Sequence, residues 1–380
     1  MMTIYLDNAA TTPMNKDVID AMNKQMLDNY GNASSLHEVG RKAYAQLDKS
    51  RQIIADSIGA KENEIIFTSG GTESNNTAII QTALENKNKG NKIITTSIEH
   101  ESVLEPMKWL EKNGFNVVYL PVNEYGQIDL NDFKNELDSK TILVSIMYGN
   151  NEVGTKLPIK EIGQLLSNHQ ALFHVDAVQA YGTEKIDVNE NNIDLLSVSA
   201  HKIGGPKQLG FLFCRKGIKF VSLLKGGEQE NKRRAGTENV PAIVGFSVAV
   251  KDLTDDVKKQ YRLKFVEYKQ KIINFLRSNN VSFEVNGTLD NSLAHILNLW
   301  IKGISSDVLL TNLDLAGVEI SAGSACTAGN LQPSHVLMSM YGNVDRIQQS
   351  VRISFGKQTT NNEIDNFLDV FLEVINKLKG

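Results

Sequence analysis

An alternation of two hydrophobic patterns over residues 64–214 is the feature that most limits the folds open to this chain. Short apolar runs typical of buried strands, such as EIIFTS at 64–69 and GFLFC at 210–214, alternate with segments of helical periodicity. Strands that alternate with helices over this length predict a parallel or mostly parallel sheet with helices on both faces. We therefore expect an α/β fold.

The length of the chain and a long helical pattern indicate a second domain. The chain has 380 residues, and at about 100–200 residues per domain two domains are expected. The helical pattern begins after Pro241, can break near Thr254–Asp255 and runs to about Ser278. Strand and helix patterns are mixed beyond it, and the last helix has one apolar face between Ile364 and Leu378. The crossing into the second domain is expected in this helical region.

The composition excludes several classes of protein. Forty basic and 44 acidic residues give a net charge of −4, without the basic excess of a protein that neutralises nucleic-acid phosphates. The longest apolar stretches, such as 243–250, are far shorter than the ~20 residues that span a bilayer. The N-terminus has no signal-peptide pattern, and two cysteines and seven histidines form no disulfide framework or metal-ligand spacing. We expect a cytoplasmic protein without a metal site, a membrane contact or a direct nucleic-acid partner.

The stretch SVSAHKIGGPK, residues 197–207, places a lysine at the end of an apolar strand. Burial of an ammonium group is costly unless the group is paired or neutralised. A lysine whose pKa is lowered by its surroundings can act as a nucleophile that forms a Schiff base, which would give Lys202 a chemical role. The alternative is a lysine whose charged end reaches solvent at the strand end. Ser199 and His201 beside it could hold a phosphate.

Polar residues follow the other predicted strands as well. They are Gly71, Thr72, His100, Asn151, Asp176 and Gln179. Each of them alone is more often structural, but ligands bind outside the carboxyl ends of the strands in an open parallel sheet. We therefore expect these side chains to converge with the lysine at one edge of the sheet.

The chemistry of these groups suggests a particular cofactor. Free N–H groups where a helix starts at Gly71 and Thr72 suit a phosphate. Asp176 could pair with a protonated ring nitrogen, and His100 could stack on a flat ring. With a Schiff-base lysine, these are the groups that a pyridoxal phosphate site requires. A plain nucleotide site is the weaker interpretation, because the chain has neither a Walker P-loop nor GxGxxG at this place.

Two further residues are candidates for function. Cys326 lies in SAGSACTAGN, a run of small residues with little to pack, which indicates an accessible thiol on a movable loop. The alternative is an incidental loop cysteine. Cys214 in GFLFC has the apolar neighbours of a structural cysteine. Arg352, in the predicted strand SVRISFG, could bind a carboxylate with two hydrogen bonds, or it could form an ordinary ion pair on an edge strand.

Along nearly its whole length the chain resembles the cysteine desulfurases, which are pyridoxal phosphate enzymes with the fold-type I aminotransferase architecture. The motifs that carry the resemblance are YLDNAATTP, GNASSLHEVGR, FTSGGTESNN, EHESV, NNEVG, HVDAVQ, SVSAHKIGGPK, RRAGTENV, GSACTAG and VRISFG. GSACT resembles the first of the two groups of this family. The chain departs from the family pattern at Ala33, Gln208 and Glu228, which puts local loop geometry in doubt but touches no proposed catalytic group.

The resemblance implies a domain division and a role for each candidate. A large domain that binds the cofactor would span residues 14–255, and a smaller domain with the Cys326 loop would comprise residues 1–13 and 256–380. Lys202 would hold pyridoxal 5′-phosphate as a Schiff base, His100 would stack on the ring, and Cys326 would be the nucleophile. Phosphate, ring and substrate contacts would come from Gly71, Thr72, Ser199, His201, Asp176, Gln179, Asn8, Asn151 and Arg352. Thr237 would reach across from the other subunit of a homodimer to the phosphate.

The activity that the resemblance implies is a sulfur transfer. L-cysteine would be converted to L-alanine, the freed lysine amine would remove the α proton, and the sulfur would remain on Cys326 as a persulfide. An acceptor protein, either an iron–sulfur scaffold or a tRNA-thiolating enzyme, would then take the sulfur. Three alternatives stay open: a selenocysteine lyase, an aminotransferase, which would not need Cys326, and a non-catalytic sulfur carrier or scaffold protein.

Overall fold

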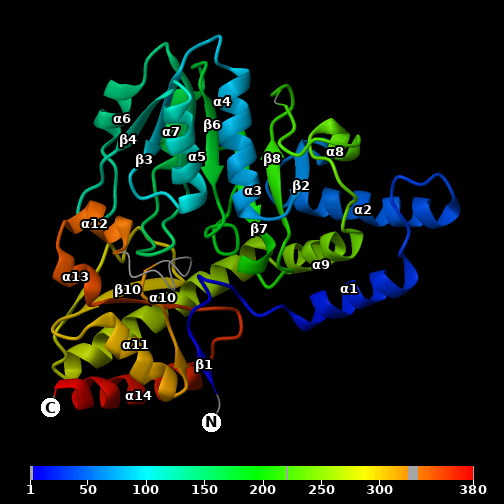
Figure 1. The fold of residues 1–380 in the computed structure, drawn as a ribbon. Coiled ribbons are helices and arrows are strands. Elements are labelled where there is room, and N and C mark those ends of the chain that lie inside the picture. Colours follow the sequence, from blue (N-terminus) through cyan, green and yellow to red (C-terminus); the bar gives the residue numbers. More distant parts are fainter. Residues whose placement is uncertain (1–2, 220, 324–332, 380) are drawn as a thin grey trace.

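The computed structural model describes residues 3–219, 221–323 and 333–379. Its largest element is a sheet of seven strands (Figure 1). The strand order is β2 (Ile65–Thr68), β8 (Gly210–Cys214), β7 (Leu195–Ser199), β6 (Leu172–Asp176), β5 (Thr141–Met147), β3 (Lys92–Thr96) and β4 (Asn116–Leu120). β7, β6, β5, β3 and β4 are parallel, and β8 runs antiparallel to β2 and β7. The expected α/β fold with a mostly parallel sheet is confirmed.

Helices cover both faces of this sheet because its strands are apolar on both sides. Phe211 and Phe213 of β8 lie in the core cluster that includes α2 (Glu38–Asp56), α7 (Ile159–Leu166) and α9 (Val240–Lys251). Leu212, between them, points to the opposite face, where it packs with Ala78. Successive side chains of a strand alternate between faces, so continuous apolar runs such as GFLFC predict burial on both sides.

This half contains further helices, most of which follow a strand of the large sheet. They are α1 (Lys16–Asp28), α3 (Gly71–Asn76), α4 (Thr82–Glu85), α5 (Glu101–Lys112), α6 (Leu130–Glu136) and the short α8 (Gln229–Lys232). A π-helical turn at Thr77–Gln81 joins α3 to α4, so helical backbone continues over residues 71–85. This helix begins directly after β2, and α5 begins just beyond β3. Their first residues therefore lie at the carboxyl ends of strands.

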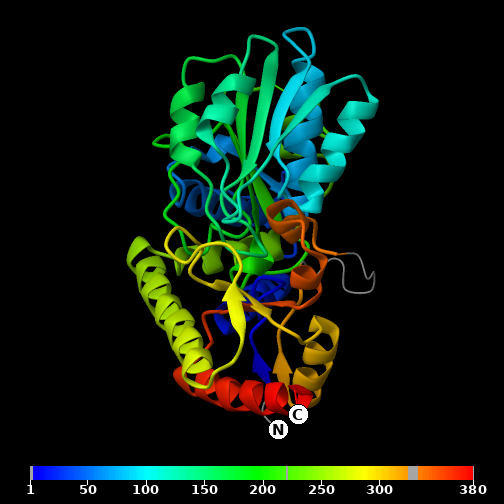
Figure 2. The same cartoon turned by 90° about the vertical axis from the view of Figure 1, so that its left-hand side faces the viewer.

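The second half of the molecule is built around two small sheets. β12 (Ser350–Ser354), β10 (Ile296–Ile301) and β9 (Phe283–Val285) form an antiparallel sheet, and β1 (Ile4–Tyr5) pairs in parallel with β11 (Val318–Glu319). The helices of this half are α10 (Asp255–Ser278), α11 (Ser306–Leu315), α12 (His335–Tyr341), α13 (Val344–Gln348) and α14 (Asn361–Lys379). Figure 2 shows α10 along one side and α14 across the end of the molecule.

Residues 4–6 pack against the C-terminal part of the chain. Ile4 and Leu6 are buried in a core cluster whose other members lie between residues 265 and 375. The amide of Leu6 donates to the carbonyl of Glu319 at 2.9 Å, and its carbonyl accepts from the amide of Ser354 at 2.7 Å. This packing supports the proposed division into residues 14–255 and residues 1–13 with 256–380. None of the described helices is long and apolar enough to cross a bilayer.

Candidate active site

A cavity of about 180 Å³ lies at the carboxyl ends of β5, β6 and β7, between the two halves of the molecule. Ten of the residues singled out in the sequence line it: Gly71, Thr72, His100, Asn151, Asp176, Gln179, Ser199, His201, Lys202 and Arg352. Asp176 and Ser199 are the last residues of β6 and β7, seven others come from segments that follow strands of the large sheet, and Arg352 comes from β12 of the other half. The expected convergence of side chains at one sheet edge is therefore present.

Two other candidates, Asn8 and Thr237, are not among the lining residues, and a third lies outside the described part of the chain. The amide nitrogen of Asn8 donates to the carbonyl of Ser354 at 3.1 Å, and Asn8 lines a second cavity of about 70 Å³. That second cavity shares Gln179 and Lys202 with the first. Thr237 is exposed, in the segment before α9. Cys326 lies outside the described residues, so its role stays a prediction.

The lysine is held by backbone carbonyls of the N-terminal segment. Nζ of Lys202 donates to the carbonyl oxygens of Ala9 at 2.6 Å and Ala10 at 2.7 Å. Lys202 ends a 3-10 turn, Ala200–Lys202, that follows the fully buried strand β7. The side chain of Gln179 donates to the same Ala9 carbonyl at 3.0 Å. These carbonyl oxygens accept hydrogen bonds from the amine and so help to position the lysine at the cavity.

Asp176 is the last residue of β6, and each of its carboxylate oxygens accepts a hydrogen bond. Its Oδ1 accepts from the amide of Val178 at 2.9 Å, and its Oδ2 accepts from the side-chain nitrogen of Asn75 at 2.7 Å. The residue is 7% exposed. Two donors fix the plane of the carboxylate, so Asp176 offers a defined acceptor to a ligand in the cavity.

His100 caps the first turn of α5. Its Nδ1 accepts from the amide of Ser102 at 3.1 Å and lies 2.8 Å from the hydroxyl of the same serine. Burial is the main cause that lowers the pKa of His100, and the charge of Lys202 acts in the same direction, while Asp176 opposes it. The ring is therefore neutral near neutral pH.

The loop from β2 into α3 offers backbone N–H groups with little side-chain bulk around them. Gly70 has a φ of 141°, which side chains rarely tolerate. A Cβ atom on Gly71 would lie 2.7 Å from Cγ2 of Val178, so only glycine fits there. Ser199 and His201 line the cavity with this loop. Burial lowers the pKa of His201 to about 4, so its ring is neutral and can donate one hydrogen bond to an anion.

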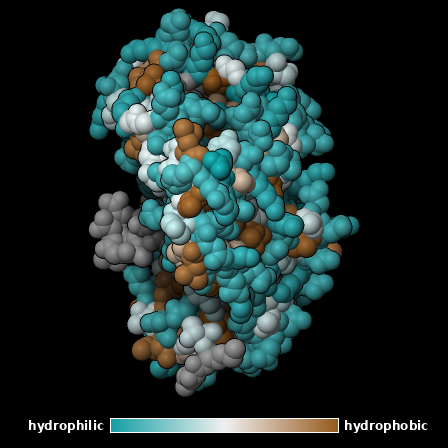
Figure 3. Space-filling model, turned by 90° about the vertical axis from the view of Figure 1, so that its right-hand side faces the viewer, coloured by the Kyte–Doolittle hydropathy of each residue, from teal (hydrophilic) through white to brown (hydrophobic). Residues whose placement is uncertain are grey.

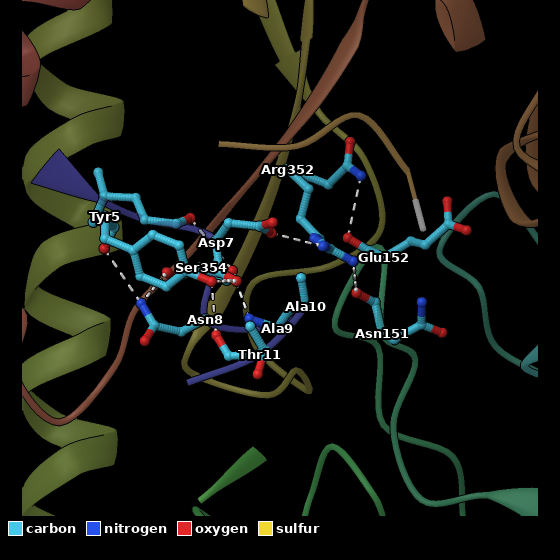
Figure 4. A network of polar contacts seen from close by, with 12 residues as sticks. Tyr5, Asp7, Asn8, Ala9, Ala10, Thr11, Asn151, Glu152, Arg352 and Ser354 are labelled. Atoms are coloured by element: carbon cyan, nitrogen blue, oxygen red, sulfur yellow. Dashed lines mark hydrogen bonds and ion pairs between the residues drawn. The ribbon is translucent and has the colours of Figure 1, made fainter. Parts of the chain in front are cut away.

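Arg352 is the cationic group from the other half of the molecule. It is 1% exposed, and Figure 4 shows its guanidinium between Asp7 and Asn151. Nη2 donates to Oδ1 of Asp7 at 2.8 Å, and Nη1 donates to the carbonyl of Asn151 at 3.0 Å. Nε is buried without a hydrogen-bond partner. A carboxylate in the cavity would therefore meet a fixed guanidinium with donor capacity left.

Comparisons with known proteins agree with this architecture. The sequence matches the aminotransferase class-V family over residues 4–367. Similar proteins include IscS 1 of Bacillus subtilis strain 168, 50% identical with 100% of both chains covered. They also include the cysteine desulfurase IscS of Methanosarcina thermophila, 45% identical over 99% of this chain and 93% of that protein. The chain belongs to the cysteine desulfurase family.

Solved structures of similar proteins support this placement. A NifS-like protein superposes with a TM-score of 0.93 at 34% identity, covering 99% of this chain and 100% of that chain. SspA in complex with cysteine superposes with a TM-score of 0.83 at 36% identity, covering 94% of this chain and 100% of SspA. The resemblance to the cysteine desulfurase family seen in the sequence is confirmed.

The cavity of this cysteine desulfurase family member fits the cofactor expected from the sequence. The cavity contains an amine, an imidazole face, a carboxylate and, near a glycine-rich helix start, hydroxyl groups. Gly71 and Thr72 line the cavity at the start of α3, where the backbone N–H groups of a first helical turn suit a phosphate. This set of groups is complete for pyridoxal phosphate before the partner residue proposed at Thr237 is counted.

Two residues near the cavity were not identified from the sequence. Asn75 is completely buried on the helix after Gly71 and contacts Asp176. A polar residue beside the apolar Ala78 and Ile79 on one helix face was a signal that could have been used. Asp7 contacts Arg352, which lies 345 positions later in the sequence, and no local pattern indicates that pair.

Proposed function

We propose that this protein is a pyridoxal 5′-phosphate-dependent cysteine desulfurase, a sulfurtransferase that converts L-cysteine to L-alanine and keeps the sulfur as a persulfide on Cys326. One observation carries the proposal beyond family membership. Lys202, Asp176, His100 and Arg352 line a single cavity although they come from distant parts of the chain. A sulfur carrier or scaffold protein has no need for this combination of groups.

Each group has a defined part in holding the cofactor. Lys202 would attach it through Nζ, and Asp176 would accept from the ring nitrogen. His100 would lie against the ring, and Gln179 would contact its phenolic oxygen. The phosphate would be held by Gly71, Thr72, Ser199 and His201, together with Thr237 of a partner subunit. When bound, pyridoxal 5′-phosphate supplies an electron sink for the bond electrons released at the substrate Cα.

The substrate is oriented by its carboxylate. Arg352 is buried and charged, and its guanidinium is fixed by Asp7 and Asn151. Because a guanidinium binds a carboxylate through directional hydrogen bonds, this contact would help to orient the amino acid relative to Lys202. The side chains of Asn151 and Asn8 are proposed to assist, although the amide of Asn8 contacts Ser354 in this structure.

Sulfur transfer requires two groups that act one after the other, first an amine and then a thiol. Lys202 Nζ, once free, takes the Cα proton of cysteine. The Cys326 thiolate then attacks the substrate sulfur: a sulfur–sulfur bond forms, the Cβ–sulfur bond breaks, and the carbon fragment leaves as alanine after protonation. The persulfide passes to an acceptor protein, either an iron–sulfur scaffold or a tRNA-thiolating enzyme, in the cytoplasm.

A homodimer is part of this proposal. Large apolar side chains of the α1–α2 region are exposed: Met26 (51%), Leu27 (78%), Tyr30 (76%), Leu36 (90%) and Tyr44 (56%). Figure 3 shows hydrophobic residues between hydrophilic ones at several places on the face of the molecule toward which these helices project. Exposed apolar groups gathered in one region favour a protein partner. The nearby segment with Thr237 is fastened by Arg234, which donates to both carboxylate oxygens of Glu73.

The test combines three measurements on the purified protein with pyridoxal 5′-phosphate. Borohydride reduction should fix the yellow chromophore to Lys202, cysteine should yield alanine, and mass spectrometry should find one added sulfur on Cys326. Comparison of turnover on cysteine and selenocysteine separates the selenocysteine lyase. A protein that never binds the chromophore and releases no alanine would be a carrier or scaffold, and the proposal would fail.

A further inference from the structure

Four polar side chains form a continuous chain of hydrogen bonds beside the cavity. The side-chain nitrogen of Asn75 lies 2.7 Å from Oδ2 of Asp176 and 2.9 Å from Oγ of Ser102. Oγ of Ser102 lies 2.8 Å from Nδ1 of His100, and the backbone amide of Ser102 lies 3.1 Å from the same Nδ1. Asn75 and Ser102 are 0% and 8% exposed. Solvent therefore competes little for these contacts.

The orientation of the Asn75 amide follows from its neighbour. Oδ2 of Asp176 is an acceptor, so the group facing it must be the NH₂ and not the oxygen of the amide. One hydrogen of this NH₂ goes to Asp176, and the second is left for Ser102. The hydroxyl oxygen of Ser102 therefore acts as an acceptor toward Asn75.

This arrangement decides where the serine hydroxyl hydrogen points. Since the Asn75 contact uses a lone pair of Oγ, the O–H of Ser102 is available to donate to Nδ1 of His100. The backbone N–H of Ser102 donates to the same atom, as a helix N-cap contact. Nδ1 thus faces two donors and can carry no hydrogen of its own. The proton of the neutral ring must be on Nε2.

Protonation of Nδ1 is disfavoured for a second reason. His100 is the N-cap of α5, a helix of 12 residues, whose N-terminal end carries partial positive charge. Burial lowers the pKa of His100, and Lys202 and His335 add to this, whereas Asp176 and Glu101 oppose it. A cationic ring would have to lose the contact with the serine amide and reverse the direction of the contact with the serine hydroxyl. The ring is therefore held neutral, as expected of an imidazole at a helix start.

We propose that Asn75 and Ser102 are positioning residues that lock His100 as a neutral Nε2–H tautomer, so that His100 serves the reaction as a hydrogen-bond donor. In this tautomer Nε2 has no lone pair to accept a proton, and Nδ1 is engaged by Ser102. His100 is therefore not the base that takes the Cα or thiol proton of the substrate. That task is left to Lys202. The inference rests on the proposed function for the identity of the reaction, but the tautomer is a property of the protein alone.

The test measures the tautomer by nuclear magnetic resonance. Protein labelled with ring-¹⁵N histidine is prepared without and with pyridoxal 5′-phosphate, and His100→Gln identifies the signals among the seven histidines. We expect a protonated Nε2 and an unprotonated Nδ1 between pH 6 and pH 9. In Ser102→Ala, which keeps only the backbone donor, the midpoint pH for protonation of His100 should rise by about one unit. Ser339→Ala, which removes a hydroxyl from exposed Ser339 on α12, is the matched control and should leave it unchanged.

Three results would overturn the inference: a ring protonated on Nδ1, a cationic ring at pH 7.5, or an unchanged titration in Ser102→Ala. A role of Ser102 in stability alone would lower the melting temperature without moving the titration of His100. Failure of the proposed function is distinguishable, because it would appear as absent alanine release while the ¹⁵N signals still report the Nε2–H tautomer.

Discussion

Asp7 and Arg352 form an ion pair of 2.8 Å that joins the N-terminal segment to β12 at the edge of the cavity. The arginine proposed to bind the substrate carboxylate is thus already oriented by a carboxylate of the protein. Because Nη1 is held by the carbonyl of Asn151 as well, the guanidinium has one defined orientation. Substrate binding should depend on this geometry and not on positive charge alone.

The first prediction concerns this guanidinium. Arg352→Lys keeps the positive charge. A single ammonium group cannot form the hydrogen bonds to Asp7 and Asn151 and also bind a substrate carboxylate. We expect the KM for cysteine to rise at least about tenfold, with a smaller change in kcat. Steady-state alanine release measures both constants. Lys357→Arg, at a half-exposed ion pair with Asp252, is the control. An unchanged KM would remove Arg352 from the substrate site.

The second prediction concerns the lysine. Lys202→Ala removes the proposed attachment point and the base, so alanine release should fall below detection and borohydride should fix no chromophore. Absorbance spectra and product analysis measure these effects. Lys207→Ala changes an exposed lysine in the same loop and should retain both properties. Normal alanine release from Lys202→Ala would contradict the assignment.

The third prediction separates the two cysteines. Cys214 is 1% exposed on β8, and burial raises the pKa of its thiol to about 12, so it has almost no thiolate at neutral pH. Incubation with cysteine should add sulfur to wild-type protein and to Cys214→Ser but not to Cys326→Ser. Mass spectrometry of peptides measures the added sulfur. A persulfide on Cys214 would show that Cys326 is not the acceptor.

The fourth prediction concerns stability. Arg51 donates through two nitrogens to the carboxylate of Glu230. The side chain of Glu230 is 2% exposed, and its backbone has a positive φ of 49°. Arg51→Met removes the cationic partner of a buried carboxylate, which keeps an amide donor from Phe67, and the free energy of unfolding should fall by about 3–5 kcal/mol. Urea denaturation measures it. Lys108→Met, which breaks an exposed pair with Glu105, should change it little. Equal effects of the two variants would contradict this account.

The fifth prediction concerns pH. Complete burial raises the pKa of Glu99 from its usual value to about 8. Between the unfolded pKa near 4.5 and pH 8, the unfolded chain releases this proton while the folded protein keeps it, so this residue makes stability fall as pH rises. Glu99→Gln should therefore lose less stability than wild type between pH 5 and pH 8, as measured by urea denaturation at both values. A larger loss in the variant would contradict the predicted direction.

The sequence was most informative for functional residues that lie at or just after the ends of strands. Lys202, Asp176 and His100 were expected together because the carboxyl ends of parallel strands share one edge, and the cavity contains all three. The antiparallel direction of β8 was not predicted, because GFLFC is apolar throughout and carries no information about direction. The short helix α13 was also not predicted.

Contacts between distant segments could not be read from local patterns. Asp7 and Arg352 are separated by 345 positions, and either residue alone suits a surface ion pair. Asn8 was assigned to the substrate from the resemblance, while the structure places its amide against Ser354. Tertiary packing determines these positions, and the local sequence around each residue does not encode that packing.

The placement of the N-terminal segment has a consequence for synthesis of the protein. Residues 4–10 supply the carbonyls that hold Lys202, the carboxylate that holds Arg352 and the strand that pairs with β11. Residues 4–10 therefore reach their final contacts only after β11 and β12 have been synthesised. The strands of the large sheet lie within residues 65–214 and can pair before β12 is synthesised, but the cavity is complete only when Arg352 of β12 is in place.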